Sequence, residues 1–513
     1  MRISSVLSAV TLVACVVLTA PLAAQGYRVG VDARFQSLAY RGWHLDSIPV
    51  TDVTTGSDGL LYTADGIGVS CLAGSAYCLY YDAGDRINAM PFVATVDVSV
   101  WNLGAKGLRF EGSGRVLGDF EDGPVASRLT GESLSAFPGT QPTFQMLEAY
   151  LSYTEHWLRV KGGRLTEASR FGYLGLDGAS IGIRAPGGQV GGSVYGGWSL
   201  ARGALLPASS SLLNPLDDNR QPQEREMVTG GEVNWNVGWL NGRLLYERQA
   251  DSSLVSSELA GGDLALHPIA PLTISGGLDY DFAYGNIGNA EATATVQLPR
   301  RYGTLAVGGR RYRPRFPLWS IWTVFSPTPY TAYFAQTGIT AIDRVQLRAH
   351  VERYAYEETG ASTALVEIDS DGWRYGLGAS YRSSANLSAT LDYQAGFGPG
   401  AQAASWDGSV FWQARPDLSV RANAALVNRS LELRYADAKL VQFGLDGDYR
   451  LMPELRVFGG AWYITEKRSR PDAAGFDWNQ LRLNFGLRYG FGTPVDRPSL
   501  PPAILRIPEG GAR

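Results

Sequence analysis

Charged side chains recur at alternate positions in several segments of this sequence of 513 residues. Side chains two residues apart on a β-strand share one face, so each segment would present a row of charges. The rows are Arg109, Glu111 and Arg115; Arg159 and Lys161; Arg344, Arg348, His350 and Glu352; and Arg482 and Arg488. Along a water-filled passage, such rows would orient small polar solutes and set ion preference. The alternative interpretation is that any wet interior is polar and that these charges simply pair.

A second candidate for solute binding is the aromatic and Pro-rich segment 312–334. Its aromatic candidates are Trp319, Trp322 and Tyr330, and arginines stand at 310, 311, 313 and 315. A loop of this composition, folded into a passage, would stack aromatic faces on sugars and bind anions through arginine. The alternative is an aromatic girdle at a membrane surface together with an ordinary loop.

Signals for catalysis and for cofactors are poor. Only four histidines occur, and only His350 lies clearly within a strand pattern. A hydrolase at a barrel rim would pair such a histidine with a Ser or Asp of a neighbouring strand, whereas a histidine in a polar interior needs no catalytic role. The acidic cluster 217–219 is too short to specify a cation site, and no Cys-x-x-Cys-His haem motif is present. The sequence therefore predicts no enzyme, no metal and no cofactor.

The cysteines indicate an oxidising compartment. Cys71 and Cys78 lie close together in the chain, a spacing that suits a short disulfide loop in an exported protein. A metal site is the alternative, but the nearest histidine is His44 and no motif completes a ligand set. We expect a disulfide between Cys71 and Cys78.

Residues 1–24 have the order of a secretory signal peptide, with Arg2, an apolar run and small residues before a break. We expect cleavage after about Ala24. The alternative is a lipoprotein cleavage box ending at Cys15, but the chain stays apolar beyond that cysteine. No later apolar run approaches the ~20 residues of a membrane helix, which excludes a helical membrane protein. No basic block points to nucleic acid as a partner.

Hydropathy alternates with a period of two in many segments of roughly ten residues along the mature chain. In 343–352 the apolar face holds Val345, Leu347, Ala349 and Val351, and polar side chains alternate with them. The segments 92–101, 387–394, 441–450 and 481–491 show the same pattern. Their length is near the ~9–11 residues that a tilted strand needs to cross a bilayer. Aromatic residues cluster at strand ends, as an interfacial girdle would: Trp101, Tyr150, Tyr153, Trp157, Tyr463 and Tyr489.

The connections between these segments differ in length. Candidate periplasmic turns are 102–107, 299–303, 414–417 and 452–454, and candidate extracellular loops are 119–143, 200–224, 313–340, 357–370 and 466–477. This asymmetry predicts an all-β fold, a single large antiparallel transmembrane β-barrel over 25–491 with roughly 18–22 strands. The segment 37–88 is predicted as a long loop or as a plug. A secreted β-sandwich, solenoid or adhesin is the alternative architecture.

The alternating strands, the export signal and the aromatic ending Leu487-Arg-Tyr-Gly-Phe491 resemble Gram-negative outer-membrane porins. The stretch Leu158-Arg-Val-Lys-Gly-Gly-Arg164, followed by Leu176-Asp-Gly178, is similar to a porin pattern in which a Gly-Arg strand precedes a loop and an Asp-Gly strand start. The resemblance implies a location in the cell outer membrane, contact with its lipid and with the barrel-insertion machinery, and passive diffusion of small hydrophilic solutes. The chain departs from porins by continuing through 492–513, a Pro-rich segment expected to be a periplasmic tail.

Two functions of other classes stay open at the level of the sequence. One is a non-conducting scaffold or sheath barrel that binds a partner protein, with 37–88 and the Pro-rich tail as its points of attachment. The other is a barrel-rim enzyme centred on His350. No oligomeric state is predicted.

Overall fold

The computed structural model describes most of the chain. The described ranges are 25–56, 59–72, 74–119, 125–126, 133–134, 143–200, 226–251, 255–299, 302–313, 329–357, 371–384, 386–398, 402–432, 436–470 and 477–493. The predicted signal peptide 1–24, the cluster 217–219, Trp319, Trp322 and residues 494–513 of the predicted tail lie outside these ranges. Within them, no helix is long and apolar enough to cross a membrane. The helical structure in these ranges is a 3-10 turn, η2 (Val50–Asp52).

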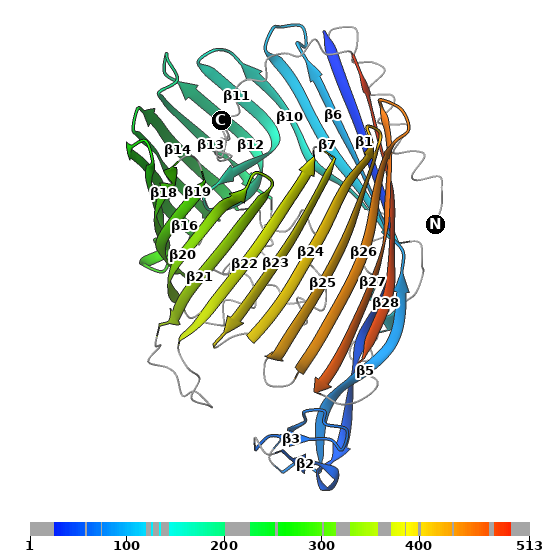
Figure 1. The fold of residues 1–513 in the computed structure, drawn as a ribbon. Helices are drawn as coiled ribbons and strands as arrows, with labels where there is room; N and C mark the ends of the chain where they lie inside the picture. The colour runs from blue at the N-terminus through cyan, green and yellow to red at the C-terminus, as the bar shows by residue number, and fades with distance from the viewer. Residues whose placement is uncertain are drawn as a thin grey trace.

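The chain forms a closed antiparallel β-barrel of 22 strands (Figure 1), which confirms the fold predicted from alternating hydropathy. The barrel closes between β1 (Gly26–Pro49) and β28 (Trp478–Gly492), which pair from Arg28 opposite Gly492 to Ser37 opposite Leu483. The other barrel strands, in order around the wall, are β6 (Pro91–Trp101), β7 (Leu108–Asp119), β10 (Thr143–Thr154), β11 (Leu158–Ser169), β12 (Gly172–Arg184), β13 (Val190–Ser199), β14 (Met227–Val237), β15 (Leu240–Ala250), β16 (Val255–Ile269), β17 (Leu272–Asp281), β18 (Asn286–Gln297), β19 (Gly303–Tyr312), β20 (Tyr330–Ile342), β21 (Val345–Tyr356), β22 (Asp371–Ser384), β23 (Leu387–Phe397), β24 (Gln402–Arg415), β25 (Leu418–Glu432), β26 (Ala436–Arg450) and β27 (Leu455–Arg470).

The barrel strands have one apolar and one polar face. On β28 the side chains of Leu481, Leu483 and Phe485 are exposed, as expected where alternate residues lie against lipid. On the opposite face, Arg488 donates to Asp32 of β1, with 2.7 Å between Nη2 and Oδ2. The outer wall is therefore apolar and the lumen is polar.

The long connections all join strands at one end of the barrel, as predicted, although that end also carries short ones such as 282–285 between β17 and β18. The four candidate periplasmic turns join β6 to β7, β18 to β19, β24 to β25 and β26 to β27, at the end where the chain enters β1 and leaves β28. Two loop predictions are wrong in extent, because β20 begins at Tyr330 and β27 continues to Arg470. In 330–340 polar and apolar residues occur on both faces of the strand, and 466–470 is polar throughout, so neither segment shows the alternation that marks a strand.

The segment 37–88 forms neither the loop nor the plug that was predicted. β1 continues past the barrel and pairs with β5 (Tyr77–Ala89), from Leu38 opposite Ala89 to Pro49 opposite Tyr77. This two-stranded arm is at the same end of the barrel as the long loops and extends outward from it (Figure 1). The prediction failed because the arm lacks the continuous apolar face by which a strand is recognised in sequence.

Short strands and a disulfide build the tip of the arm. They are β2 (Thr54–Thr55), β3 (Leu61–Tyr62) and β4 (Ser70–Cys71). The predicted disulfide between Cys71 and Cys78 is confirmed, and it joins β4 to β5. A separate pair, β8 (Val125–Ala126) and β9 (Ser133–Leu134), lies in the connection between β7 and β10.

Candidate functional site

One hairpin leaves the barrel wall and enters the lumen. β11 pairs with β10 only as far as Arg164, and β12 pairs with β13 only from Leu176 onward. Beyond these residues the two strands pair with each other, down to Ser169 opposite Gly172. We name residues 165–175 the lumen hairpin; its strands are the teal β11 and β12 of Figure 1.

Glycines make the bend at the base of the lumen hairpin. Gly163 has φ +132°, a conformation that side chains with a Cβ rarely adopt, and it pairs with Gly178. A Cβ on Gly178 would lie 2.7 Å from the Cα of Gly197, so the strands approach too closely for a side chain. Beside this glycine pair, Nε of Arg164 donates to Oδ1 of Asp177 at 2.7 Å. The Gly-Arg and Asp-Gly pairs that resemble porins therefore form the hinge of the hairpin.

Apolar packing holds the lumen hairpin against the inner wall. The buried cluster comprises Leu165, Leu174 and Leu176 of β11 and β12 with Val228 of β14. Tyr150 and Tyr195 border this cluster. Burying a leucine side chain contributes about 1.5–3 kcal/mol, so three of them form a substantial anchor. The prediction of Tyr150 in the outer girdle is wrong, because a tyrosine suits both an interface with lipid and a half-buried site in the lumen.

Ion pairs fix the turn of the lumen hairpin to a more distant part of the wall. Arg170, whose side chain is 13% exposed, lies among Asp263 of β16, Asp279 of β17 and Glu291 of β18. Its Nη1 contacts Asp263 and lies 3.5 Å from Glu291. Its Nε lies 3.7 Å from Asp279, which is 2% exposed. Nε of Arg243 on β15 donates to the same Asp263 at 2.5 Å.

Two glycines make room for this turn. A Cβ on Gly261 would lie 3.0 Å from the ring of Phe171, and a Cβ on Gly277 would collide with the guanidinium of Arg170. The turn therefore sits directly on the backbone of β16 and β17.

A buried polar group lies on the wall strands that the hairpin crosses. The hydroxyl of Tyr195 donates to Oε2 of Glu247 at 3.0 Å, and Nε2 of Gln249 donates to Oε1 at 2.9 Å. Glu247 is almost wholly buried. Both carboxylate oxygens accept a hydrogen bond, which offsets the cost of burying the charge.

The structure places most of the predicted charge rows on the lumen wall, where they form separate ion pairs. Arg109 pairs with Glu111, Lys161 with Glu167, Arg348 with Asp392, and Arg488 with Asp32. Arg115 donates to Gln145 at 2.7 Å, and His350 lies beside the ring of Phe334. Arg159 and Arg482 lie within β11 and β28. Arg344 lies outside the strands, in the turn between β20 and β21.

Glu352 belongs to a cluster that sequence reasoning did not assemble. Arg310 of β19 and Arg374 of β22 both bind it. Tyr330, predicted in a loop, begins β20 and lies within 6.0 Å of the Arg310 guanidinium. Within the described residues, the predicted aromatic segment thus supplies at least Tyr330 and Phe334 to the lumen wall.

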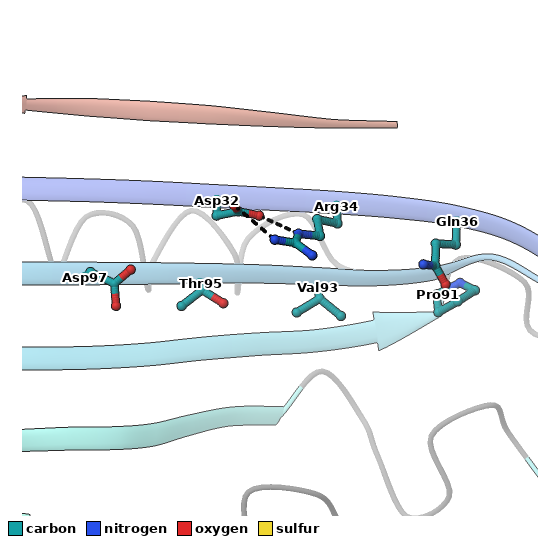
Figure 2. A pocket seen from close by; sticks show the side chains of 7 residues that line it. All are labelled: Asp32, Arg34, Gln36, Pro91, Val93, Thr95 and Asp97. Carbon is teal, nitrogen blue, oxygen red and sulfur yellow. Dashed lines mark hydrogen bonds and ion pairs between the residues drawn. The ribbon is translucent and has the colours of Figure 1, made fainter. Parts of the chain in front are cut away.

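A recess of about 490 Å³ opens on the inner wall at β1 and β6 (Figure 2). Its lining comprises Asp32, Arg34, Gln36, Pro91, Val93, Thr95 and Asp97. Nε of Arg34 donates to Oδ1 of Asp32 at 2.8 Å, and Arg488 binds the same carboxylate. The recess is therefore polar, with its carboxylate at Asp32 already paired.

The sequence did carry one signal for the missed residues. Asp263 and Asp279 each follow a glycine by two positions, so a glycine and an aspartate share the lumen face of each strand. A carboxylate beside a missing side chain is the arrangement that accepts a large cationic side chain from elsewhere. Across the described part of the chain, no group of three or more His, Cys, Asp or Glu side chains is placed to hold a metal ion.

Solved structures similar to this one are outer-membrane receptors and porins of Gram-negative bacteria. The ferric enterobactin receptor PfeA of Pseudomonas aeruginosa, in complex with enterobactin, matches over 90% of this chain and 81% of its own, with 11% identity and a TM-score of 0.52. A BenF-like porin from Pseudomonas fluorescens Pf-5 matches over 91% of this chain and 99% of its own, with 10% identity and a TM-score of 0.40. No family model and no curated protein matches the sequence.

These likenesses are likenesses of fold. They confirm the resemblance in fold to large outer-membrane barrels. Fold and lumen together define a large outer-membrane-type β-barrel with a hairpin folded into a polar lumen.

Proposed function

We propose that this protein is an outer-membrane channel through which small hydrophilic solutes diffuse passively. The observation that carries the proposal is a polar lumen inside a closed, outwardly apolar wall, with the lumen hairpin docked on one side. The hairpin contacts β13, β14 and β16 to β18, which form one contiguous part of the wall. It therefore narrows the passage from one side, and a charged passage admits polar solutes more readily than apolar ones.

The proposed location is the outer membrane of a Gram-negative bacterium, after removal of the signal peptide at about Ala24. Exposed apolar side chains around the outer wall support contact with lipid. Phe491, near the end of β28, is the aromatic that the barrel-insertion machinery would recognise. Because the chain leaves β28 at the end with the short turns, the tail 492–513 would lie in the periplasm.

Single-channel recording tests this proposal. The refolded full-length mature protein, checked for folding by its heat-modifiable mobility in detergent gels, is added to a planar lipid bilayer. We expect stepwise currents of uniform size. In liposomes, swelling rates should fall as the size of the sugar increases. A folded barrel that gives no current and no swelling overturns the channel.

The arm favours a second candidate function, a barrel that binds a partner protein outside the membrane. Its two strands extend beyond the wall from Leu38 to Pro49 and from Tyr77 to Ala89. Since Tyr40 lies opposite Ile87 in the register, an Asn-Gly turn joining these positions removes the arm and keeps the barrel. Unchanged conductance in this variant, with loss of a partner captured on intact cells, would support the second function. Loss of conductance would tie the arm to the channel and overturn a separate role.

A further inference from the structure

Two arginines on the lumen wall share a single buried carboxylate. Nη2 of Arg310 donates to Oε2 of Glu352 at 2.5 Å, and Nη1 of Arg374 donates to Oε1 at 2.6 Å. The three residues therefore carry one positive charge in excess. Glu291, the carboxylate opposite Arg310 in the register of β18 and β19, forms an ion pair with Arg170 at 3.5 Å. They lie on neighbouring strands, since Glu352 pairs with Arg374 across β21 and β22, and Arg310 pairs with Ala332 across β19 and β20.

The cluster presents its positive part to the lumen. The side chains of Arg310 and Arg374 are 40% and 39% exposed, whereas Glu352 is 1% exposed. A solute in the lumen would therefore meet two guanidinium groups, and their compensating carboxylate lies beneath them. A guanidinium has five N–H donors in a fixed fork, and Glu352 engages one terminal nitrogen of each arginine. Nε of Arg310 is buried, and Arg374 also hydrogen-bonds Tyr330, so the donors left for a second oxyanion are on the remaining terminal nitrogens.

Aromatic rings hold the two guanidinium groups in place. The guanidinium carbon of Arg374 lies 4.3 Å from the ring centre of Tyr354 and 5.5 Å from that of Tyr330. The guanidinium carbon of Arg310 lies 6.0 Å from the same Tyr330 ring. Tyrosine rings over guanidinium groups attract the cation and limit its motion. Less conformational freedom is then lost when an anion binds.

Small residues let these large side chains lie against the wall. Ala332 stands between Arg310 and Tyr354 in the strand register and is fully buried. A Cβ on Gly372 would lie 2.5 Å from the ring of Tyr354. The cluster is thus held by packing among four consecutive strands, β19 to β22.

We propose that Arg310 and Arg374 form a binding subsite for the carboxylate or phosphate group of a small organic anion that passes through the lumen. The subsite rests on the proposed channel function, because its ligand reaches it from the lumen. Arginine is suited to this task because its planar fork matches the two oxygens of a carboxylate or phosphate.

The test compares variants of the subsite with a matched control on the same wall. Arg310→Gln or Arg374→Gln alone removes the one excess positive charge, and the double variant leaves the cluster with the negative charge of Glu352. Arg348→Gln is the control, because Arg348 of β21 makes a one-to-one pair with Asp392 of β23 at 2.7 Å. Each purified barrel is titrated with succinate, with inorganic phosphate and with neutral succinamide, by isothermal titration calorimetry and by block of single-channel current.

We expect saturable binding of succinate or phosphate to the unaltered protein and none of succinamide. The double variant should bind the anion about tenfold more weakly or worse, since hydrogen bonds between charged groups are strong, whereas Arg348→Gln should bind like the unaltered protein. Succinate alone or phosphate alone identifies which oxyanion the subsite accepts. Currents without any saturable anion binding, or equal losses in Arg348→Gln and in the double variant, overturn the subsite and leave the channel intact. Absence of current overturns the channel, and calorimetry still reports on the subsite.

A second variant guards against misfolding of the arginine variants. Glu352→Gln has nearly the same shape and removes the buried negative charge, so the excess positive charge doubles. Anion binding should become tighter. Unchanged or weaker binding in this folded variant contradicts the proposal.

Discussion

Two of the arginine clusters described on the lumen wall have opposite surroundings. Arg170 is 13% exposed and lies among three carboxylates, whereas Arg310 and Arg374 are about three times more exposed and both bind Glu352. Glu291 stands between the clusters, opposite Arg310 in the strand register and 3.5 Å from Nη1 of Arg170. Carboxylates outnumber cations around the first cluster, and cations outnumber carboxylates in the second. The ratio of charges and the degree of burial therefore decide whether a lumen arginine tethers the chain or stays available to a solute.

The largest expected effect follows from removing the tether. Arg170→Met removes from Asp263, Asp279 and Glu291 the cation that the lumen hairpin supplies, and Asp279 keeps its hydrogen bonds from Asn289. Removing one partner of a buried ion pair costs about 3–5 kcal/mol, which is enough to favour release of the lumen hairpin. We expect larger and noisier single-channel currents.

Arg243→Met is the control for this variant. It removes a cation from the same Asp263, but Arg243 stands on the wall and not on the hairpin. Its currents should stay close to those of the unaltered protein. If Arg170→Met also leaves the currents unchanged, the ion pairs do not hold the hairpin.

A smaller effect is expected from the apolar anchor of the hairpin. Leu176→Ala leaves a cavity in the cluster with Leu165 and Val228 and should cost about 2–5 kcal/mol. The measurement is the midpoint of unfolding in guanidinium chloride, followed by tryptophan fluorescence, together with current noise. Leu445→Ala, on the exposed outer face of β26, is the control and should change neither. Equal shifts in the two variants would mean that the cluster has no special role.

Salt should separate the two arginine clusters. The Debye length falls from about 10 Å at 0.1 M to about 3 Å at 1 M, and exposed charges are screened far more than buried ones. Raising KCl over this range should weaken anion block at Arg310 and Arg374 and leave the docking of Arg170 intact. Block constants and current noise, recorded at both concentrations, report on each cluster. If the current noise rises with salt as steeply as the anion block weakens, the two arginine clusters do not differ in their exposure to solvent as proposed.

The smallest effect is expected at the outermost carboxylate around Arg170. Glu291 is 57% exposed and lies 3.5 Å from Nη1 of Arg170. Exposed ion pairs contribute about 0–1 kcal/mol, so Glu291→Gln should leave the current nearly unchanged. A change as large as that of Arg170→Met would show that exposure is a poor guide to which carboxylate matters here.

The barrel was predictable because its rule is local. Alternation within each strand of about ten residues marks one face for lipid and one for water, and the spacing of Cys71 and Cys78 marks a disulfide. The residues of the hinge are also recognisable in the sequence, because the Gly-Arg pair ending at Arg164 and the Asp-Gly pair starting at Asp177 resemble a porin pattern. The contacts of this hinge, between Arg164 and Asp177 and between the two glycines beside them, join β11 and β12, which are adjacent in the sequence.

The docked hairpin was not predictable, because its contacts join distant positions. Arg170 contacts Asp263 and Asp279, and although a glycine two positions before each aspartate marks them, nothing in the sequence identifies Arg170 as their partner. Alternation likewise does not show whether a tyrosine lies on the lipid-facing or the lumen-facing side of its strand, which is why the prediction of Tyr150 in the outer girdle was wrong. The arm was missed for the converse reason, since a paired ribbon without an apolar face leaves no periodic signal.

The strand that closes the barrel is also one side of the arm. β1 runs for 24 residues, about 80 Å of extended chain. Its first part is paired with β28 at the closing seam, and its second part is paired with β5 outside the wall. A pull on the tip of the arm would therefore act along a single backbone as shear on the hydrogen bonds that keep the cylinder shut.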